Sequence, residues 1–106
     1  MAEALIIEFN APNVQDLYNQ VNEELGMDLA HGEAGVNDPA TGPLVHLSTL
    51  SADGTHMTVT EVWASKEVQA TFMTDRLGPA LAKVGVPDPT RMEWQQLIGY
   101  YPDLDA

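Results

Sequence analysis

Two apolar segments joined by a turn occupy residues 44–64, which read LVHLSTL, SADGT and HMTVTEVWA in succession. The pair Asp53-Gly54 lies in the middle, and an Asp-Gly pair between two strand-like segments is typical of a β-hairpin turn. We therefore predict strands over residues 44–50 and 56–64. Both strands are apolar or neutral on both faces, whereas a sheet with one face in water alternates more regularly. We expect helices to cover one face and another sheet to cover the other.

The segment before the hairpin predicts a strand and a helix. Residues 4–10 are apolar and β-branched, which favours a strand. Residues 14–25 carry apolar side chains at helical spacing, with Asn13 at the expected N-cap and Gly26 as a natural stop.

The segment after the hairpin predicts a second helix and a fourth strand. Ser65 is expected to cap the helix, and Gly78-Pro79 should cause a kink or a fresh helical start, because proline disfavours helical geometry in the residue before it. The strand is predicted over residues 91–100.

The resulting order is βαββαβ, the ferredoxin-like α+β arrangement of a four-stranded antiparallel sheet with two helices on one face. We expect residues 1–106 to form one domain. The other face of the sheet would expose a larger apolar patch than monomers usually tolerate, so we predict a homodimer in which two sheets face each other.

Composition excludes several kinds of partner and site. The chain has no cysteine, so thiolate chemistry and disulfides are excluded. Its net charge of −12 would repel nucleic acid and anionic membranes, and no apolar stretch is long enough for a membrane span. The start lacks a basic signal-peptide region, so we expect a cytoplasmic protein.

Residues 26–43 form a Gly- and Pro-rich connection of unusual length, which suits either a binding loop or a mobile segment without function. His31 and Glu33 lie in it two residues apart, but a metal site needs three or four convergent donors. We predict no metal site, and no Gly-rich phosphate loop or nucleophile motif indicates a cofactor.

The chain also resembles a known family. The third predicted strand runs into its helix as Glu61-Val62-Trp63-Ala64-Ser65-Lys66-Glu67-Val68, and the helix continues to Arg76-Leu77-Gly78-Pro79-Ala80-Leu81. These two segments resemble the dimeric α/β-barrel superfamily, specifically the small proteins similar to antibiotic biosynthesis monooxygenases. The resemblance covers nearly the whole chain apart from residues 26–43.

The resemblance implies a homodimer with a cavity between the sheet and the helices of each subunit. Activities in the family include cofactor-free oxygenation of polyketide aromatics, haem degradation, and isomerisation or ring closure. Trp63 matches a strand-end tryptophan of the oxygenating members, and Asn10 lies near an asparagine of the haem-degrading ones. The oxygenases carry an asparagine four residues before the tryptophan, where this chain has Val59.

His46 and Glu61 are the candidate catalytic residues. Strand side chains alternate between faces, so Glu61 shares a face with Trp63. If that face looks at the helices, an apolar pocket would favour the neutral carboxyl, which suits a general acid or base. An imidazole at His46 could move a proton near neutral pH. Each residue also has a structural explanation. Glu61 could lie near a sheet edge or pair with a basic group across the dimer, and His46 could be a buried, hydrogen-bonded histidine of the core. The register between their strands stays open.

Four residues complete the predicted ligand site. They are Asn10 as a polar anchor, Trp63 as a wall, Tyr18 on the apolar face of the first helix and Phe72 on the buried stripe of the second. Packing in the core is the more common role for aromatic residues such as Trp63 and Tyr18.

Three functions remain open. The chain could be an enzyme that binds a hydrophobic or aromatic, polyketide-like molecule and performs proton transfer or cofactor-free oxygenation, with the former favoured by Val59. It could be a non-catalytic dimeric module that binds a ligand or a protein. Haem binding is the third, and it would need His46 or another histidine as axial ligand.

Overall fold

The computed structural model describes residues 2–26 and 42–99. Within these residues the elements are β1 (Glu3–Asn10), α1 (Val14–Leu25), β2 (Val45–Leu50), β3 (His56–Trp63), α2 (Lys66–Phe72), the π-helical segment η2 (Met73–Leu77), α3 (Gly78–Val84) and β4 (Arg91–Gln95). The strands form one sheet in the order β2-β3-β1-β4, with every neighbouring pair antiparallel. This confirms the predicted α+β fold.

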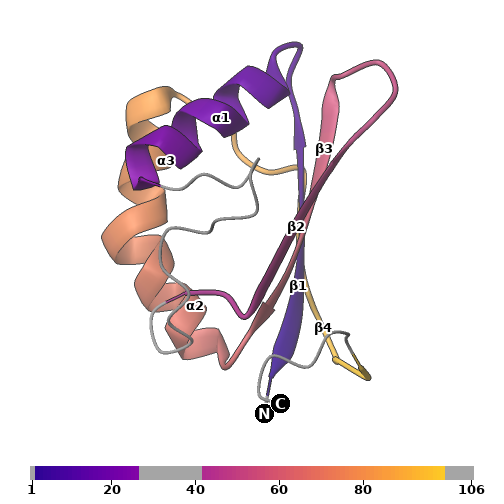
Figure 1. Cartoon of the computed structure of the whole chain (residues 1–106), viewed down its shortest axis with the longest axis vertical. Coiled ribbons are helices and arrows are strands. Elements are labelled where there is room, and N and C mark those ends of the chain that lie inside the picture. Colours follow the sequence, from indigo (N-terminus) through magenta and orange to yellow (C-terminus); the bar gives the residue numbers. More distant parts are fainter. Residues whose placement is uncertain (1, 27–41, 100–106) are drawn as a thin grey trace.

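All helices lie against one face of the sheet, and the opposite face carries no helix in the described part of the chain (Figure 1). The core forms between these two layers. It is built from alternate residues of the central strands packed against the helices: Leu5, Ile7, Val14, Met57, Val59, Trp63 and Phe72. Because side chains alternate along a strand, the residues between them face away from the helices.

Three helix ends lie at the predicted residues, Asn13, Gly26 and Ser65, and only one of the two N-caps forms a side-chain hydrogen bond. Ser65 accepts a hydrogen bond from the backbone N–H of Val68 at 3.2 Å, so it caps α2 as expected. Gly26 ends α1 in the left-handed conformation at φ 71°. Asn13 lies at the N-cap of α1 as predicted, but its side chain makes no capping hydrogen bond.

The second helical region is interrupted where Gly78-Pro79 predicted it. A π-helical turn ends at Leu77, and α3 begins at Gly78 with the proline in its first turn. A β-carbon at Gly78 would lie 2.7 Å from the carbonyl oxygen of Met73, so the backbone packs more closely here than a larger residue permits.

The fourth strand is shorter than predicted. It ends at Gln95 and not at residue 100, because Gln95 pairs with Ala4 and β1 itself begins only one residue earlier, at Glu3. Within residues 2–26 and 42–99 no strand pairs with the chain beyond Gln95. Ile98 is 97% exposed.

Candidate functional site

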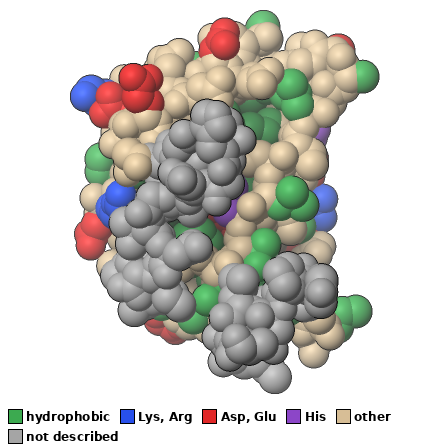
Figure 2. Space-filling model, viewed as in Figure 1, with side chains coloured by type: hydrophobic (Ala, Val, Ile, Leu, Met, Phe, Trp, Pro, Cys, Tyr) green, Lys and Arg blue, Asp and Glu red, His purple; other side chains and the backbone are tan. Residues whose placement is uncertain are grey.

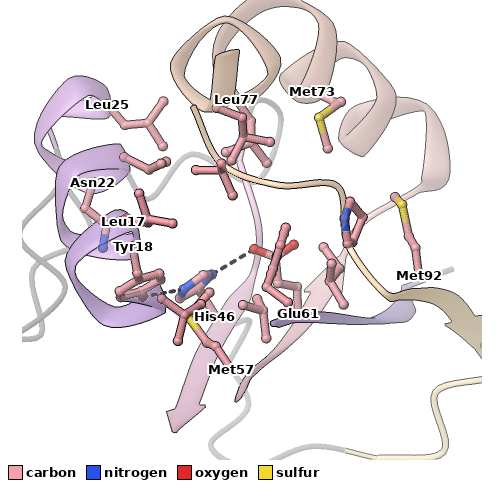
Figure 3. Close-up of a pocket in the computed structure, with 18 of the residues that line it drawn as sticks. Leu17, Tyr18, Asn22, Leu25, His46, Met57, Glu61, Met73, Leu77 and Met92 are labelled. Atoms are coloured by element: carbon pink, nitrogen blue, oxygen red, sulfur yellow. Dashed lines mark hydrogen bonds and ion pairs between the residues drawn. The ribbon is translucent and has the colours of Figure 1, made fainter. Parts of the chain in front are cut away.

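A cavity of about 370 Å³ lies between the sheet and the helices. Its walls are mainly apolar and come from both layers: Leu17, Leu25 and Leu77 from the helices and Met57 and Met92 from the strands are labelled in Figure 3. Ile7, Phe9, Val59, Phe72 and Leu81 also line it. A cavity of this size and character is typical of a site for a small hydrophobic molecule.

The β2–β3 hairpin places two ionisable side chains at this cavity. His46 lies directly opposite Glu61 in the strand register, and both side chains line the cavity. The alternation of β2 directs Leu47 to the other face, where it is 56% exposed. The Glu61 side chain is 8% exposed and that of His46 is 19% exposed. A buried carboxylate is costly unless it is paired and hydrogen-bonded, so its partners matter.

Both oxygens of Glu61 have such partners. The indole N–H of Trp63 donates to Oε1 at 3.1 Å, and Nδ1 of His46 lies 2.8 Å from Oε2. No buried polar side-chain atom in the described residues lacks a hydrogen-bond partner. Trp63 and His46 therefore fix the position of the carboxylate from two sides.

The other nitrogen of His46 faces two hydroxyl groups. Nε2 lies 2.8 Å from the Tyr18 hydroxyl and 3.0 Å from Oγ of Ser48, and Ser48 donates to Tyr18 at 2.6 Å. Figure 3 shows Tyr18, His46 and Glu61 in a row beside the apolar walls. With Nδ1 donating to Glu61, a neutral His46 accepts at Nε2. The hydrogen bonds then run in one direction, from Ser48 to Tyr18, from Tyr18 to His46 and from His46 to Glu61.

Four of the six predicted site residues line the cavity: Tyr18, His46, Glu61 and Phe72. Trp63 lies behind it, fully buried, in contact with the ring of Phe72 and bonded to Glu61. Trp63 contacts the site only through Glu61 and Phe72 and does not line the cavity, which corrects the predicted placement.

Asn10 requires a larger correction. It follows Phe9 on β1, and Phe9 lines the cavity, so Asn10 faces the opposite side of the sheet. There its side chain is hydrogen-bonded to Nδ1 of His56. The prediction placed Asn10 at the correct end of the strand and on the wrong face.

Ser48 was missed as a site residue. It lies two positions after His46 on β2, and residues two apart on a strand share a face. This spacing was visible in the sequence once His46 had been chosen, so the signal existed.

The outer face of the sheet carries a separate charged network. The guanidinium of Arg91 bonds to Glu8 at 2.9 Å and also contacts Glu93, while Nε2 of His56 lies 2.8 Å from Glu8. The hydrogen bond from Arg91 lowers the pKa of Glu8, and it likewise lowers the pKa of Glu93. The bond to Glu8 raises the pKa of Arg91. These groups belong to the face away from the cavity.

The charge distribution agrees with the strongly acidic composition. Figure 2 shows acidic side chains on the helical layer and a histidine side chain between the helical and strand layers. Within residues 2–26 and 42–99 no group of three or more histidine and acidic residues could bind a metal ion, and no helix is long and apolar enough to cross a membrane. His31, Glu33 and the predicted loop at 26–43 lie almost wholly outside the described residues.

The position of His46 also bears on haem. Both ring nitrogens are hydrogen-bonded, so ligation of an iron through Nε2 would displace Tyr18 and Ser48. His56 lies on the other face of the sheet with both of its nitrogens bonded.

No protein-family model matches the chain, and no curated protein matches it. Solved structures do. One, described as a candidate antibiotic biosynthesis monooxygenase from Chloroflexus aurantiacus J-10-fl, has a TM-score of 0.67 at 16% identity, over 95% of this chain and 97% of that one. A second protein described in the same way, from Caulobacter crescentus CB15, has a TM-score of 0.63 at 18% identity, over 92% of this chain and 91% of that one.

A third is a monooxygenase of Streptomyces coelicolor in complex with nanaomycin D, with a TM-score of 0.59 at 16% identity, over 96% of this chain and 92% of that one. At these identities the likeness shows the fold. The chain therefore has the fold of the antibiotic biosynthesis monooxygenases, as the resemblance of its sequence implied.

Proposed function

We propose that this chain is a small enzyme that binds a hydrophobic, aromatic molecule between its sheet and helices. It catalyses a proton transfer on this molecule, as in an isomerisation or a cyclisation. The observation that supports this most strongly is the hydrogen-bonded pair of His46 and Glu61 at the wall of an otherwise apolar cavity. Paired titratable groups at such a cavity are a common feature of active sites. A monooxygenase of the same fold, crystallised with nanaomycin D, is consistent with an aromatic ligand.

His46 is the general base in this proposal. Glu61 orients the imidazole through Nδ1 and stabilises the positive charge that develops when Nε2 takes a proton. Nε2 already faces Tyr18, so a proton from the ligand reaches it either directly, after Tyr18 turns aside, or through the Tyr18 hydroxyl. Trp63 and Glu61 act as positioning residues.

Proton transfer is preferred over cofactor-free oxygenation for one reason. The polar residue expected four positions before Trp63 is Val59, which lines the cavity with an apolar surface. If the oxygenase reaction occurs nevertheless, His46 would generate the substrate carbanion that reacts with oxygen, so both reactions need the same base. Oxygen consumption with an electron-rich naphthol distinguishes them.

The test needs no knowledge of the natural substrate. 2-Tetralone is a bicyclic ketone with acidic C–H bonds, and exchange of these hydrogens in D2O is followed by NMR. We expect the protein to accelerate exchange and His46→Ala to slow the accelerated rate at least about 100-fold, the usual effect of losing a general base. His56→Ala is the matched control, because His56 lies on the opposite face. Equal rates for His46→Ala and the unchanged protein would remove His46 from this role.

A non-catalytic binding module is the alternative. The observation that favours it is that Tyr18, His46, Ser48 and Glu61 are hydrogen-bonded to one another, so none of these four has to bind a ligand to be satisfied. The rest of the cavity wall is mainly apolar, with Asn22 and Asp88 as its other polar residues. Binding of 2-tetralone without any acceleration of exchange would support this alternative.

We also propose that two chains associate through the bare face of the sheet. On this face the apolar side chains lie around the row in which Val45, Val62 and Ala4 pair, with Leu47 and Ile6 beside that row. Burial of an exposed side chain such as Leu47 favours such an association. Leu47→Lys should shift sedimentation from dimer to monomer, whereas Leu50→Lys, an exposed leucine of the other face, should not. A monomer for the unchanged protein would refute this proposal.

A further inference from the structure

The hydroxyl of Ser48 stands where the nucleophile of an acyl-transfer enzyme would stand. Its Oγ lies 3.0 Å from Nε2 of His46, and Nδ1 of the same imidazole lies 2.8 Å from Oε2 of Glu61. A hydroxyl, an imidazole and a carboxylate joined in this order form the nucleophile, base and orienting group of serine hydrolases, which are recognised by geometry and not by sequence order.

We propose that Ser48, His46 and Glu61 form such a triad, and that the protein hydrolyses hydrophobic esters. This activity goes beyond the proton transfer proposed above, although it uses the same histidine. Ser48 and His46 are the catalytic residues, and Glu61 is a positioning residue that acts through His46.

Tyr18 supplies the donor that the transition state requires. Acyl transfer places negative charge on the former carbonyl oxygen, and a nearby hydroxyl can stabilise it. The Tyr18 hydroxyl oxygen lies 2.6 Å from Oγ of Ser48, and Tyr18 lines the cavity. A carbonyl carbon within bonding reach of Ser48 therefore brings its oxygen near this hydroxyl.

A rotation of two hydroxyl hydrogens converts the resting arrangement into the reactive one. At rest Ser48 donates to Tyr18, and Tyr18 faces Nε2. When an ester enters, the Ser48 hydrogen turns to Nε2 and the Tyr18 hydrogen turns to the carbonyl oxygen. No heavy atom of Ser48 has to move, because its Oγ is already within hydrogen-bond distance of Nε2.

The reaction is balanced without a cofactor. Oγ of Ser48 attacks the carbonyl carbon while its proton passes to Nε2 of His46. The tetrahedral intermediate collapses, the C–O bond to the alcohol breaks, and the alcohol leaves with the proton from His46. Water then attacks the acyl-serine, gives its proton to His46, and releases the acid as the proton returns to Ser48.

The cavity indicates the class of ester. About 370 Å³ of mainly apolar space is lined by His46, Glu61 and Tyr18, and the Ser48 hydroxyl is hydrogen-bonded to two of them, His46 and Tyr18. This space suits an uncharged hydrophobic acyl group. Glu61 lines the same cavity and disfavours an acyl group that carries a carboxylate.

The first test is hydrolysis of p-nitrophenyl butyrate, followed by the absorbance of p-nitrophenolate. We expect Ser48→Ala and His46→Ala each to lower kcat/KM at least about 100-fold, and the double variant to be no slower than either, because members of a triad act as a unit. Thr49→Ala is the control, since Thr49 neighbours Ser48 on the same strand but is exposed on the other face. Hydrolysis that survives Ser48→Ala would overturn the proposal.

The second test uses the unchanged protein, so it does not depend on the folding of a variant. A fluorophosphonate reacts covalently with activated serines, and mass spectrometry of the digested protein identifies the labelled residue. We expect the label on Ser48. Labelling of another residue, or of none, would overturn the proposal. Exchange of 2-tetralone hydrogens without ester hydrolysis would refute this activity alone, and hydrolysis without exchange would refute only the proton transfer.

Discussion

Trp63 donates its indole N–H to Oε1 of Glu61 across 3.1 Å, and both residues are buried, at 0% and 6% exposure. The two lie two positions apart on β3, on the face that looks toward the helices. A tryptophan of the core thereby determines where a carboxylate of the cavity points.

Trp63→Phe should lower the free energy of unfolding by about 1–3 kcal/mol through the unpaired carboxylate oxygen alone, in addition to the loss of packed volume. Urea denaturation measures the total. The hydrogen-bond share is isolated by repeating the substitution in Glu61→Leu, where no acceptor remains. Equal losses in both backgrounds would show that the bond contributes nothing to stability.

Gly78→Ala should be destabilising by about 1–3 kcal/mol, because the new β-carbon would lie 2.7 Å from the Met73 carbonyl oxygen and the backbone would have to move. Without this contact, alanine inside a helix would be more stable than glycine by about 1 kcal/mol. A loss of stability in Gly78→Ala would therefore support the close contact with Met73, and a gain would contradict it. Gly99→Ala, where a β-carbon meets nothing within 4 Å, is the control for thermal unfolding.

Ser65→Ala should cost about 1 kcal/mol, since the Ser65 hydroxyl accepts from the Val68 N–H at the start of α2. Asn13→Ala should cost much less, because Asn13 forms no such bond at the start of α1. Chemical denaturation of the two variants compares them directly. Similar losses would contradict the assignment of the caps.

Asp53 in the hairpin turn should titrate at unusually low pH. The Ser51 hydroxyl, the Thr55 hydroxyl and the Thr55 backbone N–H donate to it, and they lower its pKa from 3.8 to about 2. Because the folded pKa lies below the unfolded one, the stabilisation is present above pH 3.8 and is lost as the pH falls toward 2.

The carboxyl carbon resonance of Asp53 measures this directly by NMR. Ser51→Ala should raise the midpoint toward 3.8, because the Ser51 hydroxyl is the largest cause of the shift. A midpoint near the ordinary value in the unchanged protein would mean that the turn does not form these bonds in solution.

Most of the fold could be predicted because its signals are local. Two apolar segments and the Asp53-Gly54 turn located the hairpin, and Gly78-Pro79 located the helical interruption to within one residue. The π-helical turn before it could not be predicted, since it depends on how the helix packs. The end of β4 could not be predicted from its own residues either, because it depends on pairing with β1 and therefore on where β1 begins.

The site was predicted less completely, because it depends on register and on face. His46 and Glu61 were chosen from their chemistry, but only strand pairing places them opposite each other. Asn10 was assigned to the cavity because it ends the first strand near an asparagine of the haem-degrading relatives. It follows the cavity-lining Phe9 directly, so the alternation of the strand places it on the other face. Trp63 was placed beside the cavity and lies behind it.

The pairing of His46 with Glu61 has a consequence for the order of folding. The two residues are 15 positions apart in the chain and are joined by a single hairpin. Hairpins close within about 1–10 μs, whereas β4 must return to β1 across more than 80 residues of chain, as the 83-residue separation of Arg91 and Glu8 shows. The imidazole of His46 and the carboxylate of Glu61 can thus come together early in folding, when the hairpin closes. The later pairing of β4 and packing of the helices then bury the pair.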